Sequence, residues 1–308
     1  MIKLFTHTDL DGIGCAILAL YAFEQKVEIT YCDYNNINER VKEFYTSLPE
    51  NQLLWYSECY ITDISVSPEV AEIIDKSILP TRLFDHHETA LCLNKYDWCD
   101  VVIEKDDVQT CGTELFYSWL RDNQKLMDVP ALGRFVEVVR NYDTWRWASM
   151  GAEGVISDKV NKLFGLYGRD KFILWALCKI YDNSFPKLHS SDDLILDVEQ
   201  SRIDEYVSQK ARQITSATIC GHYCGVVFAE NYVSELGNRL CKMFPNFDFV
   251  AIIDMAACKV SYRTVKDNID LGRDVAAKFG GGGHVKAAGS QITPEFQRQV
   301  IKKIFNVP

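Results

Sequence analysis

The fold is decided near the start of the chain, by the stretch Ile2-Lys3-Leu4-Phe5-Thr6-His7-Thr8-Asp9-Leu10-Asp11-Gly12. Its first residues form a short, mostly apolar run, as expected of a buried strand. His7, Asp9 and Asp11 then alternate along the chain, and side chains two residues apart point the same way in an extended segment. Gly12 allows a tight turn into the apolar residues that follow. The stretch therefore predicts a strand, a cluster of three potential metal ligands and a helix, in that order.

Strand-like and helix-like segments alternate through the first half of the chain. The sequence predicts strands at 28–32, 59–62, 82–84 and 101–103, and helices at 12–23, 38–48, 68–76, 111–127 and 130–142. Thr110 is the predicted cap of the helix at 111–127. Alternation of this kind predicts a mostly parallel sheet covered by helices on both faces. In such sheets the functional crevice lies beyond the carboxyl ends of the strands.

The second half of the chain has a different pattern. A polar-rich run without glycine or proline predicts a long exposed helix over residues 197–212. Beyond it, strands are predicted at 225–229, 249–255 and 259–263, and helices at 233–243 and 294–305. The predicted fold class is therefore α/β, with a larger first domain at 1–190, a connector helix at 191–214, and a smaller α/β domain at 215–308.

The composition is that of an ordinary globular protein. The 308 residues are 47% hydrophobic and 25% charged, and the formal net charge is −10. This profile excludes a disordered tail protein, a collagen-like repeat and a disulfide miniprotein. We find no charge-free apolar stretch of about 18 residues and no signal-peptide pattern, so the sequence predicts no membrane partner.

The cysteines predict the compartment. Eleven are scattered without a regular framework, which favours buried thiols in a reducing compartment and hence a cytoplasmic protein. The pair Cys220 and Cys224 has the spacing of half a zinc site. No second pair lies at a matching distance, so free thiols are the favoured interpretation.

The net charge is divided unevenly along the chain. Residues 215–308 carry 11 basic and 8 acidic side chains, whereas residues 1–214 carry 22 and 35. An acidic body argues against a general DNA-coating protein, which needs a basic face. The division suits a protein that holds cations in its first part and contacts phosphate with its second.

Potential metal ligands gather at four places, each at the end of a predicted strand or helix. They are His7, Asp9 and Asp11; Asp63; Asp85-His86-His87; and Asp143. Taken singly, each has an ordinary explanation, such as a helix cap for Asp63, a surface loop for the histidine pair or a helix end for Asp143. Together they favour a metal site, because close carboxylates repel one another without a cation. Imidazole and carboxylate ligands without thiolates suit Mn²⁺.

These clusters resemble, in order, the four motifs of the DHH phosphoesterases, which are named after the triplet found here at 85–87. Further along, Gly280-Gly281-Gly282-Gly283-His284 is similar to the glycine motif of the accompanying DHHA1 domain, and Ser261-Tyr262-Arg263 resembles its Ser-x-Arg segment. The resemblance covers essentially the whole chain, and residues 150–215 are its least diagnostic part. It implies a DHH catalytic domain at 1–190 and a DHHA1 substrate-binding domain at 215–308, with the active site in the cleft between them.

The resemblance also implies roles for single residues. His7 and Asp9 would hold one Mn²⁺, while Asp11, His86 and Asp143 would hold a second, and Asp63 would bridge the two. Mg²⁺ and Co²⁺ are the expected substitutes. His87 would act on the scissile phosphate, and Asp85 would orient the histidines.

In the second domain, the resemblance implies a grip on the terminal phosphate of the substrate. The residues expected to provide it are Arg263, Gly281, Gly282, Gly283 and His284. Consecutive glycines expose backbone N–H groups that can cradle an anion. A flexible hinge is the alternative explanation of the same glycines.

Within the family, this chain most resembles the nanoRNases of the NrnB type. The resemblance implies a Mn²⁺-dependent exoribonuclease that hydrolyses short oligoribonucleotides to mononucleotides by attack of a hydroxide held between two ions. The alternative is a pAp phosphatase or a phosphodiesterase of cyclic or linear dinucleotides. The substrate is then the expected partner, with no stable nucleic-acid complex, and a homodimer is one candidate assembly. Tyr262, Trp145 or Trp147 could stack a base, although packing around the metal site is the favoured role of the two tryptophans.

Overall fold

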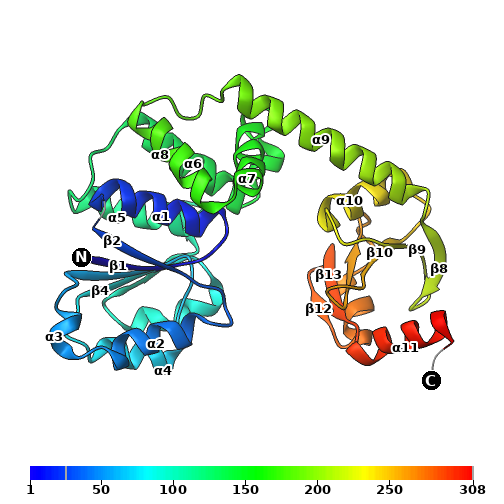
Figure 1. Ribbon diagram of the computed structural model, residues 1–308, viewed down its shortest axis with the longest axis horizontal. Helices are drawn as coiled ribbons and strands as arrows, with labels where there is room; N and C mark the ends of the chain where they lie inside the picture. The colour runs from blue at the N-terminus through cyan, green and yellow to red at the C-terminus, as the bar shows by residue number, and fades with distance from the viewer. Residues whose placement is uncertain (25, 307–308) are drawn as a thin grey trace. The chain divides into compact units, whose positions relative to one another are not determined.

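A computed structural model describes residues 1–24 and 26–306, which divide into two units after Leu196 (Figure 1). Each unit contains its own sheet and its own hydrophobic cores. The predicted α/β class is confirmed. The predicted domain limits at 190 and 214 stay a prediction, and the structural division falls after Leu196.

The sheet of the first unit has five strands in the order β2-β1-β3-β4-β5, and every neighbouring pair is parallel. The strands are β1 (Ile2–Thr6), β2 (Val27–Tyr31), β3 (Glu58–Thr62), β4 (Thr81–Asp85) and β5 (Cys99–Val101). The edge strand β5 lies two residues earlier than predicted, because Cys99 and Val101 pair with Leu83 and Asp85 of β4. Parallel pairing brings the carboxyl ends of β1, β3 and β4 side by side at one edge of the sheet.

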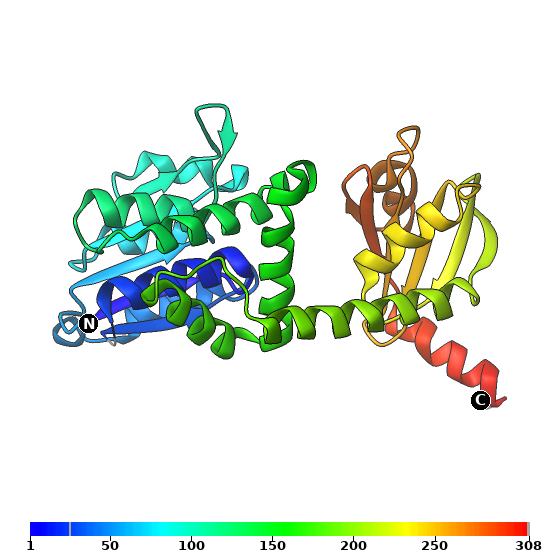
Figure 2. The ribbon, with the colours of Figure 1, turned by 90° about the horizontal axis from the view of Figure 1, so that it is seen from above.

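Helices cover both faces of this sheet, as Figure 1 shows. One face carries α2 (Ile37–Ser47), α4 (Pro68–Asp75), the short α3 (Glu50–Leu53) and the 3-10 segment η1 (Glu88–Lys95). The other face carries α1 (Leu10–Phe23), α5 (Gly112–Asp122), α6 (Pro130–Asp143), α7 (Val155–Tyr167) and α8 (Arg169–Tyr181). The short segments η2 (Arg146–Ser149) and η3 (Gly151–Glu153) join α6 to α7, and the β6–β7 hairpin (Glu104–Lys105 and Val108–Gln109) stands out from the unit in Figure 2.

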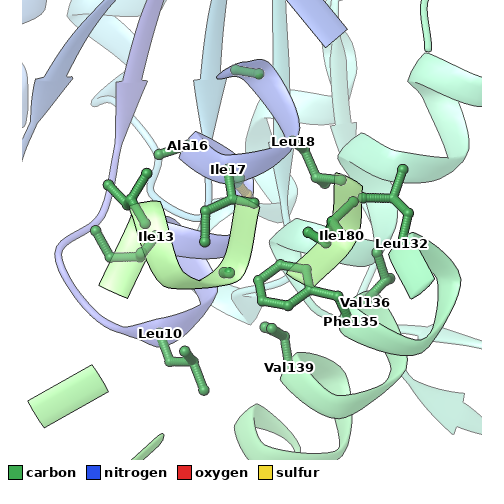
Figure 3. Packing of buried hydrophobic residues seen from close by; sticks show 14 of the residues in the cluster. Leu10, Ile13, Ala16, Ile17, Leu18, Leu132, Phe135, Val136, Val139 and Ile180 are labelled. Carbon is green, nitrogen blue, oxygen red and sulfur yellow. The ribbon is translucent and has the colours of Figure 1, made fainter. Parts of the chain in front are cut away.

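Helix α1 is the centre of the larger core. Ten of its residues are buried, so it is apolar on nearly every side, as a helix between a sheet and a second helical layer must be. Figure 3 shows the apolar side chains of α1 packed against those of α6 and α8, with Phe135 and Ile180 at the contact. This packing fixes the amino end of α1, where the first ligand cluster lies.

Helix α5 differs from its prediction at both ends. Thr110 does not cap it, because the Thr110 hydroxyl donates to the backbone carbonyl of Val102, and Cys111 takes the cap position. The helix ends at Asp122 rather than 127, since Gln124 adopts a left-handed conformation with φ 54°.

The predicted long helix is present as α9 (Ser190–Ala211), visible along its length in Figure 2. It begins earlier than the predicted 197. Among the described residues, no helix is both long enough and apolar enough to cross a bilayer.

The second unit contains a six-stranded sheet in the order β12-β13-β11-β10-β9-β8, in which only the β9–β10 pair is parallel. The strands are β8 (Thr215–Ile219), β9 (His222–Phe228), β10 (Phe249–Asp254), β11 (Lys259–Arg263), β12 (Gly282–Gly283) and β13 (Ala287–Gln291). Helix α10 (Val233–Met243) covers one face together with part of α9. The short helical turns η4 (Leu271–Val275) and η5 (Ala276–Phe279) pack on the other face, and α11 (Pro294–Phe305) closes the chain.

Candidate metal centre

The predicted ligands of the first unit come together beyond the carboxyl ends of three adjacent strands. His7 directly follows β1, Asp63 directly follows β3, and His86 directly follows β4. Asp143 reaches the same place as the last residue of α6. Residues far apart in the sequence thus meet because β1, β3 and β4 are neighbours in one parallel sheet.

His7, Asp9 and Asp63 form a first group whose ligand atoms lie within 4.8 Å of one another. Nδ1 of His7 is 2.8 Å from Oδ2 of Asp9 and 3.7 Å from Oδ2 of Asp63. Yet Nδ1 of His7 and Oδ2 of Asp63 are both buried without a partner in hydrogen-bond geometry. Buried polar atoms rarely lack a partner, and a bound cation would supply one for both of these atoms.

Asp11, His86 and Asp143 form a second group on the same criterion. Nε2 of His86 lies 3.7 Å from Oδ2 of Asp11 and 3.6 Å from Oδ2 of Asp143. The same nitrogen is 3.3 Å from Oδ1 of Asp63. Asp63 therefore turns one carboxylate oxygen toward each group, which supports the bridging role that the sequence predicts for it.

The backbone around Asp63 is held in an unusual conformation. Asp63 has φ 57°, in the left-handed region that L-residues other than asparagine, aspartate and glycine seldom adopt. Only 1% of the residue is exposed. Strained backbone that persists at a buried position is typical of functional sites.

Asp11 is fixed by the amino end of α5. Its two carboxylate oxygens accept hydrogen bonds from the backbone amides of Gly112 at 2.6 Å and Thr113 at 2.8 Å. The Thr113 hydroxyl also donates to the backbone carbonyl of Asp11 at 2.7 Å. The helix terminus therefore orients this carboxylate and supports its negative charge.

Gly112 is needed at this contact because no side chain fits there. A Cβ atom at position 112 would lie 2.7 Å from Cβ of Asp63 and 2.9 Å from its Cα. We expect Gly112→Ala to lower the free energy of unfolding by about 1–3 kcal/mol, since Asp63 or α5 must move. Urea unfolding measures the change.

The matched control for that variant is Gly165→Ala, which lies in α7 and has open space where its Cβ would be. Alanine there is expected to stabilise the protein by up to about 1 kcal/mol, because it favours the helix. Equal unfolding free energies for the two variants would contradict the close packing of α5 against Asp63.

The electrostatics of the centre favour cations. Burial raises the pKa of Asp63 well above its ordinary value, and the nearby Asp11 and Asp9 raise it further. Burial and the same two carboxylates raise the pKa of Asp143 to about 8. Burial also lowers the pKa of His86, which favours the neutral imidazole that can act as a ligand. Oxygen and imidazole donors, orphaned buried atoms and mutually repelling carboxylates together fit divalent ions such as Mn²⁺ or Mg²⁺.

Asp85 and His87 lie beside the ligands and form a hydrogen-bonded pair. Asp85 is 1% exposed, and its Oδ1 is 2.7 Å from Nδ1 of His87 and accepts from the backbone amide of His86 at 2.8 Å. The Ser65 hydroxyl donates to its other oxygen. The Asp85 carboxylate raises the pKa of His87. Asp85 also lies within a further group of potential ligands with Asp63, His86 and His87. Its two oxygens, however, are already hydrogen-bonded to Ser65, to the His86 amide and to His87.

Asp9 has a double contact. Its Oδ1 accepts from the backbone amide of Gly12 at 3.1 Å and so caps α1, while its Oδ2 faces His7. The ordinary role of an aspartate before a helix is thus combined with a place among the ligands.

Sequence reasoning missed Tyr34, which follows β2 at the same edge of the sheet. Its hydroxyl is 3.1 Å from Nε2 of His87, and its ring centroid is 5.1 Å from that of His7. Tyrosine is not among the common ligands of Mn²⁺, so the ligand pattern gave no reason to include it. Its place after a strand of the same sheet was the only available signal.

The aromatic residues considered for base stacking differ in exposure, and the favoured prediction for Trp145 and Trp147 was packing around the metal site. Trp145 is 71% exposed and stacks on Trp147 at 6.1 Å, which in turn stacks on Tyr142 beside Asp143. Tyr262 is only 3% exposed, and its hydroxyl is hydrogen-bonded to Ser290. The prediction that Tyr262 could stack a base is therefore wrong.

In the second unit, a pocket of about 390 Å³ brings together most of the predicted phosphate-gripping residues. Arg263 and the glycines at 281–283 line it. Lys259 and Ser261 line it as well, because they share the β11 face with Arg263, and Lys259 was not predicted. His284 is exposed and is not among the lining residues, while its backbone amide donates to Ala287.

Comparison with known proteins gives one close relative and several similar folds. No family model matches the sequence. Oligoribonuclease NrnB of Bacillus subtilis (strain 168) is 36% identical over 311 residues, which cover 100% of this chain and 77% of that protein.

Two solved structures share the fold. The manganese-bound exonuclease RecJ has a TM-score of 0.59 at 14% identity, over 98% of this chain and 88% of that one. The pGpG-specific phosphodiesterase PggH of Vibrio cholerae has a TM-score of 0.53 at 13% identity, over 99% of this chain and 98% of that one. At these identities the likeness extends to the fold alone.

Proposed function

Because the chain belongs to the family of oligoribonuclease NrnB, among the DHH phosphoesterases, and is a hydrolase of phosphoester bonds, we propose that it degrades short oligoribonucleotides to mononucleotides. The observation that carries the proposal is a pair of ligand groups that share Asp63. Such an arrangement is suited to the in-line hydrolysis of a phosphodiester.

Two divalent ions are the proposed cofactors, Mn²⁺ first and Mg²⁺ or Co²⁺ as substitutes. His7, Asp9 and Asp63 would hold one ion, and Asp11, His86, Asp143 and the second oxygen of Asp63 the other. When bound, the ions would supply Lewis acidity toward the phosphoryl oxygens and lower the pKa of water to near neutrality.

His87 and Asp85 supply the proton chemistry of the chain itself. The buried Asp85 accepts from Nδ1 of His87 and so keeps the proton on that nitrogen, leaving Nε2 as the reactive atom. Since Asp85 also raises the pKa of His87, the ring holds a second proton at higher pH than a free imidazole. We assign to His87 the donation of that proton to a phosphoryl or leaving-group oxygen.

Arg263 is the proposed recognition residue for the terminal phosphate of the substrate. Its guanidinium donates to Ser234 Oγ at 2.9 Å and to its neighbour's carbonyl at 2.9 Å, so its position is fixed beside the glycine loop. Arg263→Ala should raise KM about 10- to 100-fold for a trinucleotide with a terminal phosphate, the loss expected for a charge-assisted hydrogen bond. The same substrate without that phosphate should show little change.

The matched control is Arg273→Ala, since Arg273 is an exposed arginine of the same unit that pairs with Asp274. Its removal should leave both substrates unaffected. Equal effects of Arg263→Ala on phosphorylated and unphosphorylated substrates would exclude terminal-phosphate recognition by this residue.

An exposed aromatic ring that follows the last metal ligand in the chain supports a nucleotide substrate. Trp145 lies two residues after the ligand Asp143 in the chain, is largely exposed, and stacks on Trp147. Stacking of a base on such a ring contributes about 1–3 kcal/mol and does not depend on sequence. We propose Trp145 as the stacking residue.

The experiment that tests the proposed function is a length series of 5′-labelled oligoribonucleotides with Mn²⁺ and with EDTA. Adding pAp, linear dinucleotides and cyclic dinucleotides to the series separates the alternatives. Mononucleotide release from two- to five-residue RNA that stops in EDTA supports the proposal. Turnover of pAp or cyclic dinucleotides alone would replace it with the alternative activity.

We also propose a cytoplasmic location. All eleven cysteines are free and seven of them are buried, which suits a reducing compartment.

A further inference from the structure

Tyr34 is held at the edge of the candidate centre by a hydrogen-bonded turn. The turn is tied to β1 through the backbone amide of Cys32, which donates to the carbonyl of Thr6 at 2.8 Å. Two further hydrogen bonds lie within the turn. The Asp33 amide donates to Asn36 Oδ1 at 3.0 Å, and the Asn35 amide donates to Asp33 Oδ1 at 2.8 Å. Tyr34 is nevertheless 59% exposed, so its side chain is displayed rather than packed in a core.

This exposed side chain touches residues on both sides of the centre. Its hydroxyl is 3.1 Å from Nε2 of His87. Its ring lies edge-on to the His87 ring at 6.0 Å and tilted against the His7 ring at 5.1 Å. An exposed tyrosine that contacts two functional histidines is difficult to explain by stability, because its burial contributes little.

The direction of the hydrogen bond follows from the other side of the His87 ring. Asp85 is buried and holds the proton on Nδ1 of His87 at 2.7 Å. In the neutral ring, Nε2 is then an acceptor, and the Tyr34 hydroxyl donates to it. His87 is therefore fixed at both nitrogens, by a buried carboxylate on one side and an exposed hydroxyl on the other.

A small pocket lies against the same pair. Its volume is about 250 Å³, and Tyr34, His87, Asn38, Ser65 and Thr89 are among the residues that line it. Because Tyr34 and His87 themselves line this pocket, polar groups of a substrate that enter it can reach both side chains. When the His87 ring also carries the proton that it is proposed to donate, Nε2 becomes a donor, and an incoming phosphoryl oxygen can accept its hydrogen bond in place of the hydroxyl.

We propose that Tyr34 is a positioning residue, whose hydroxyl holds the His87 ring with Nε2 directed at the site of the reacting phosphate. This role rests on the proposed function of His87 in phosphodiester hydrolysis. Without the hydroxyl, only Asp85 would orient the His87 ring. The ring would then spend more time in orientations in which Nε2 is not directed at the reacting phosphate.

The test removes the hydroxyl and keeps the ring. Tyr34→Phe should lower kcat about 5- to 10-fold on a short oligoribonucleotide at saturating Mn²⁺, the effect of losing one hydrogen bond, with KM changed less than about twofold. The control is Tyr56→Phe, which loses the same group from a hydrogen bond to Glu28 Oε2 at 2.5 Å elsewhere in the unit and should keep the wild-type kcat.

A second measurement needs neither metal nor substrate. Nitrogen NMR of the imidazole rings, at one pH and in EDTA, should show the His87 Nε2 resonance displaced in Tyr34→Phe and unmoved in Tyr56→Phe. The resonance is assigned with His87→Gln. Because the protein is metal-free, this result stands even if the wild-type enzyme proves inactive on RNA, a failure that would concern the proposed function alone.

Two outcomes would contradict the positioning role of Tyr34. An unmoved Nε2 resonance together with a wild-type kcat in Tyr34→Phe would overturn the positioning role. A wild-type kcat in Tyr34→Phe combined with a raised KM in Tyr34→Ala would also overturn it and would assign the ring to base stacking instead.

Discussion

Asp63→Asn is expected to abolish metal-dependent hydrolysis, with kcat/KM lowered by about 10³-fold or more. The two oxygens of Asp63 face different ligand groups, at 3.7 Å from His7 and 3.3 Å from His86, so one substitution weakens both ion sites. A decrease of this size in kcat/KM is expected when a major electrostatic contribution to transition-state stabilisation is lost. Initial rates over a range of Mn²⁺ concentrations measure it.

Asparagine is the informative replacement because the backbone of Asp63 has φ 57°. Asparagine tolerates this left-handed conformation, whereas alanine would add strain to the loss of the ligand. The metal-free variant should be at least as stable as the wild type at pH 8, since a neutral amide replaces a buried carboxylate that burial and its neighbours disfavour. Asp122→Asn, on the exposed face of α5, is the control and should be fully active. An active, Mn²⁺-dependent Asp63→Asn enzyme would exclude a bridging carboxylate.

The metal-free protein is expected to lose stability as the pH rises from about 4 to about 8. The pKa of Asp143 is raised from 3.8 to about 8, so in this window the folded state binds more protons than the unfolded state. The free energy of unfolding then falls with increasing pH, by at most about 1.4 kcal/mol per pH unit for one such group. Asp63 acts in the same direction.

The histidines modify this slope. The raised pKa values of His7 and His87 contribute stability that is present below about pH 6.5 and is lost as the pH rises through their folded values. The lowered pKa of His86 has the opposite effect below its ordinary value. Above pH 6.5, His7 and His87 therefore act in the same direction as Asp143 and Asp63, and the stability falls with rising pH.

Urea unfolding in EDTA at several pH values measures the effect. Mn²⁺ should restore stability, and more strongly at pH 8 than at pH 5, because bound cations replace the protons. Asp143→Asn should flatten the slope. If the stability of the metal-free protein instead rises between pH 5 and pH 8, the carboxylates of the centre do not have the raised pKa values on which this prediction rests.

The sequence was sufficient to predict the first unit in outline. Apolar strands with ligands directly after them have a period and a position that can be recognised without coordinates. The resemblance to the DHH family implied the convergence of His7, Asp63 and His86, whereas the strand order that places β1, β3 and β4 side by side is known only from the structure. The meeting of these residues required no knowledge of side-chain detail.

Other features depend on tertiary contacts that leave no local pattern. Tyr34 and Lys259 belong to their sites only because a turn and a strand face place them there. The anchoring of Asp11 by α5 joins residues about one hundred positions apart. Strands β8 and β13 were not predicted, since they are built largely from small and polar residues that give a weak alternating signal.

The most direct test of the centre is anomalous diffraction from crystals grown with Mn²⁺, recorded near the manganese absorption edge. We predict two peaks in the first unit, one among His7, Asp9 and Asp63 and the other among Asp11, His86 and Asp143, with the Asp63 carboxylate touching both. A single peak, or manganese bound away from these six side chains, would contradict a shared two-ion site.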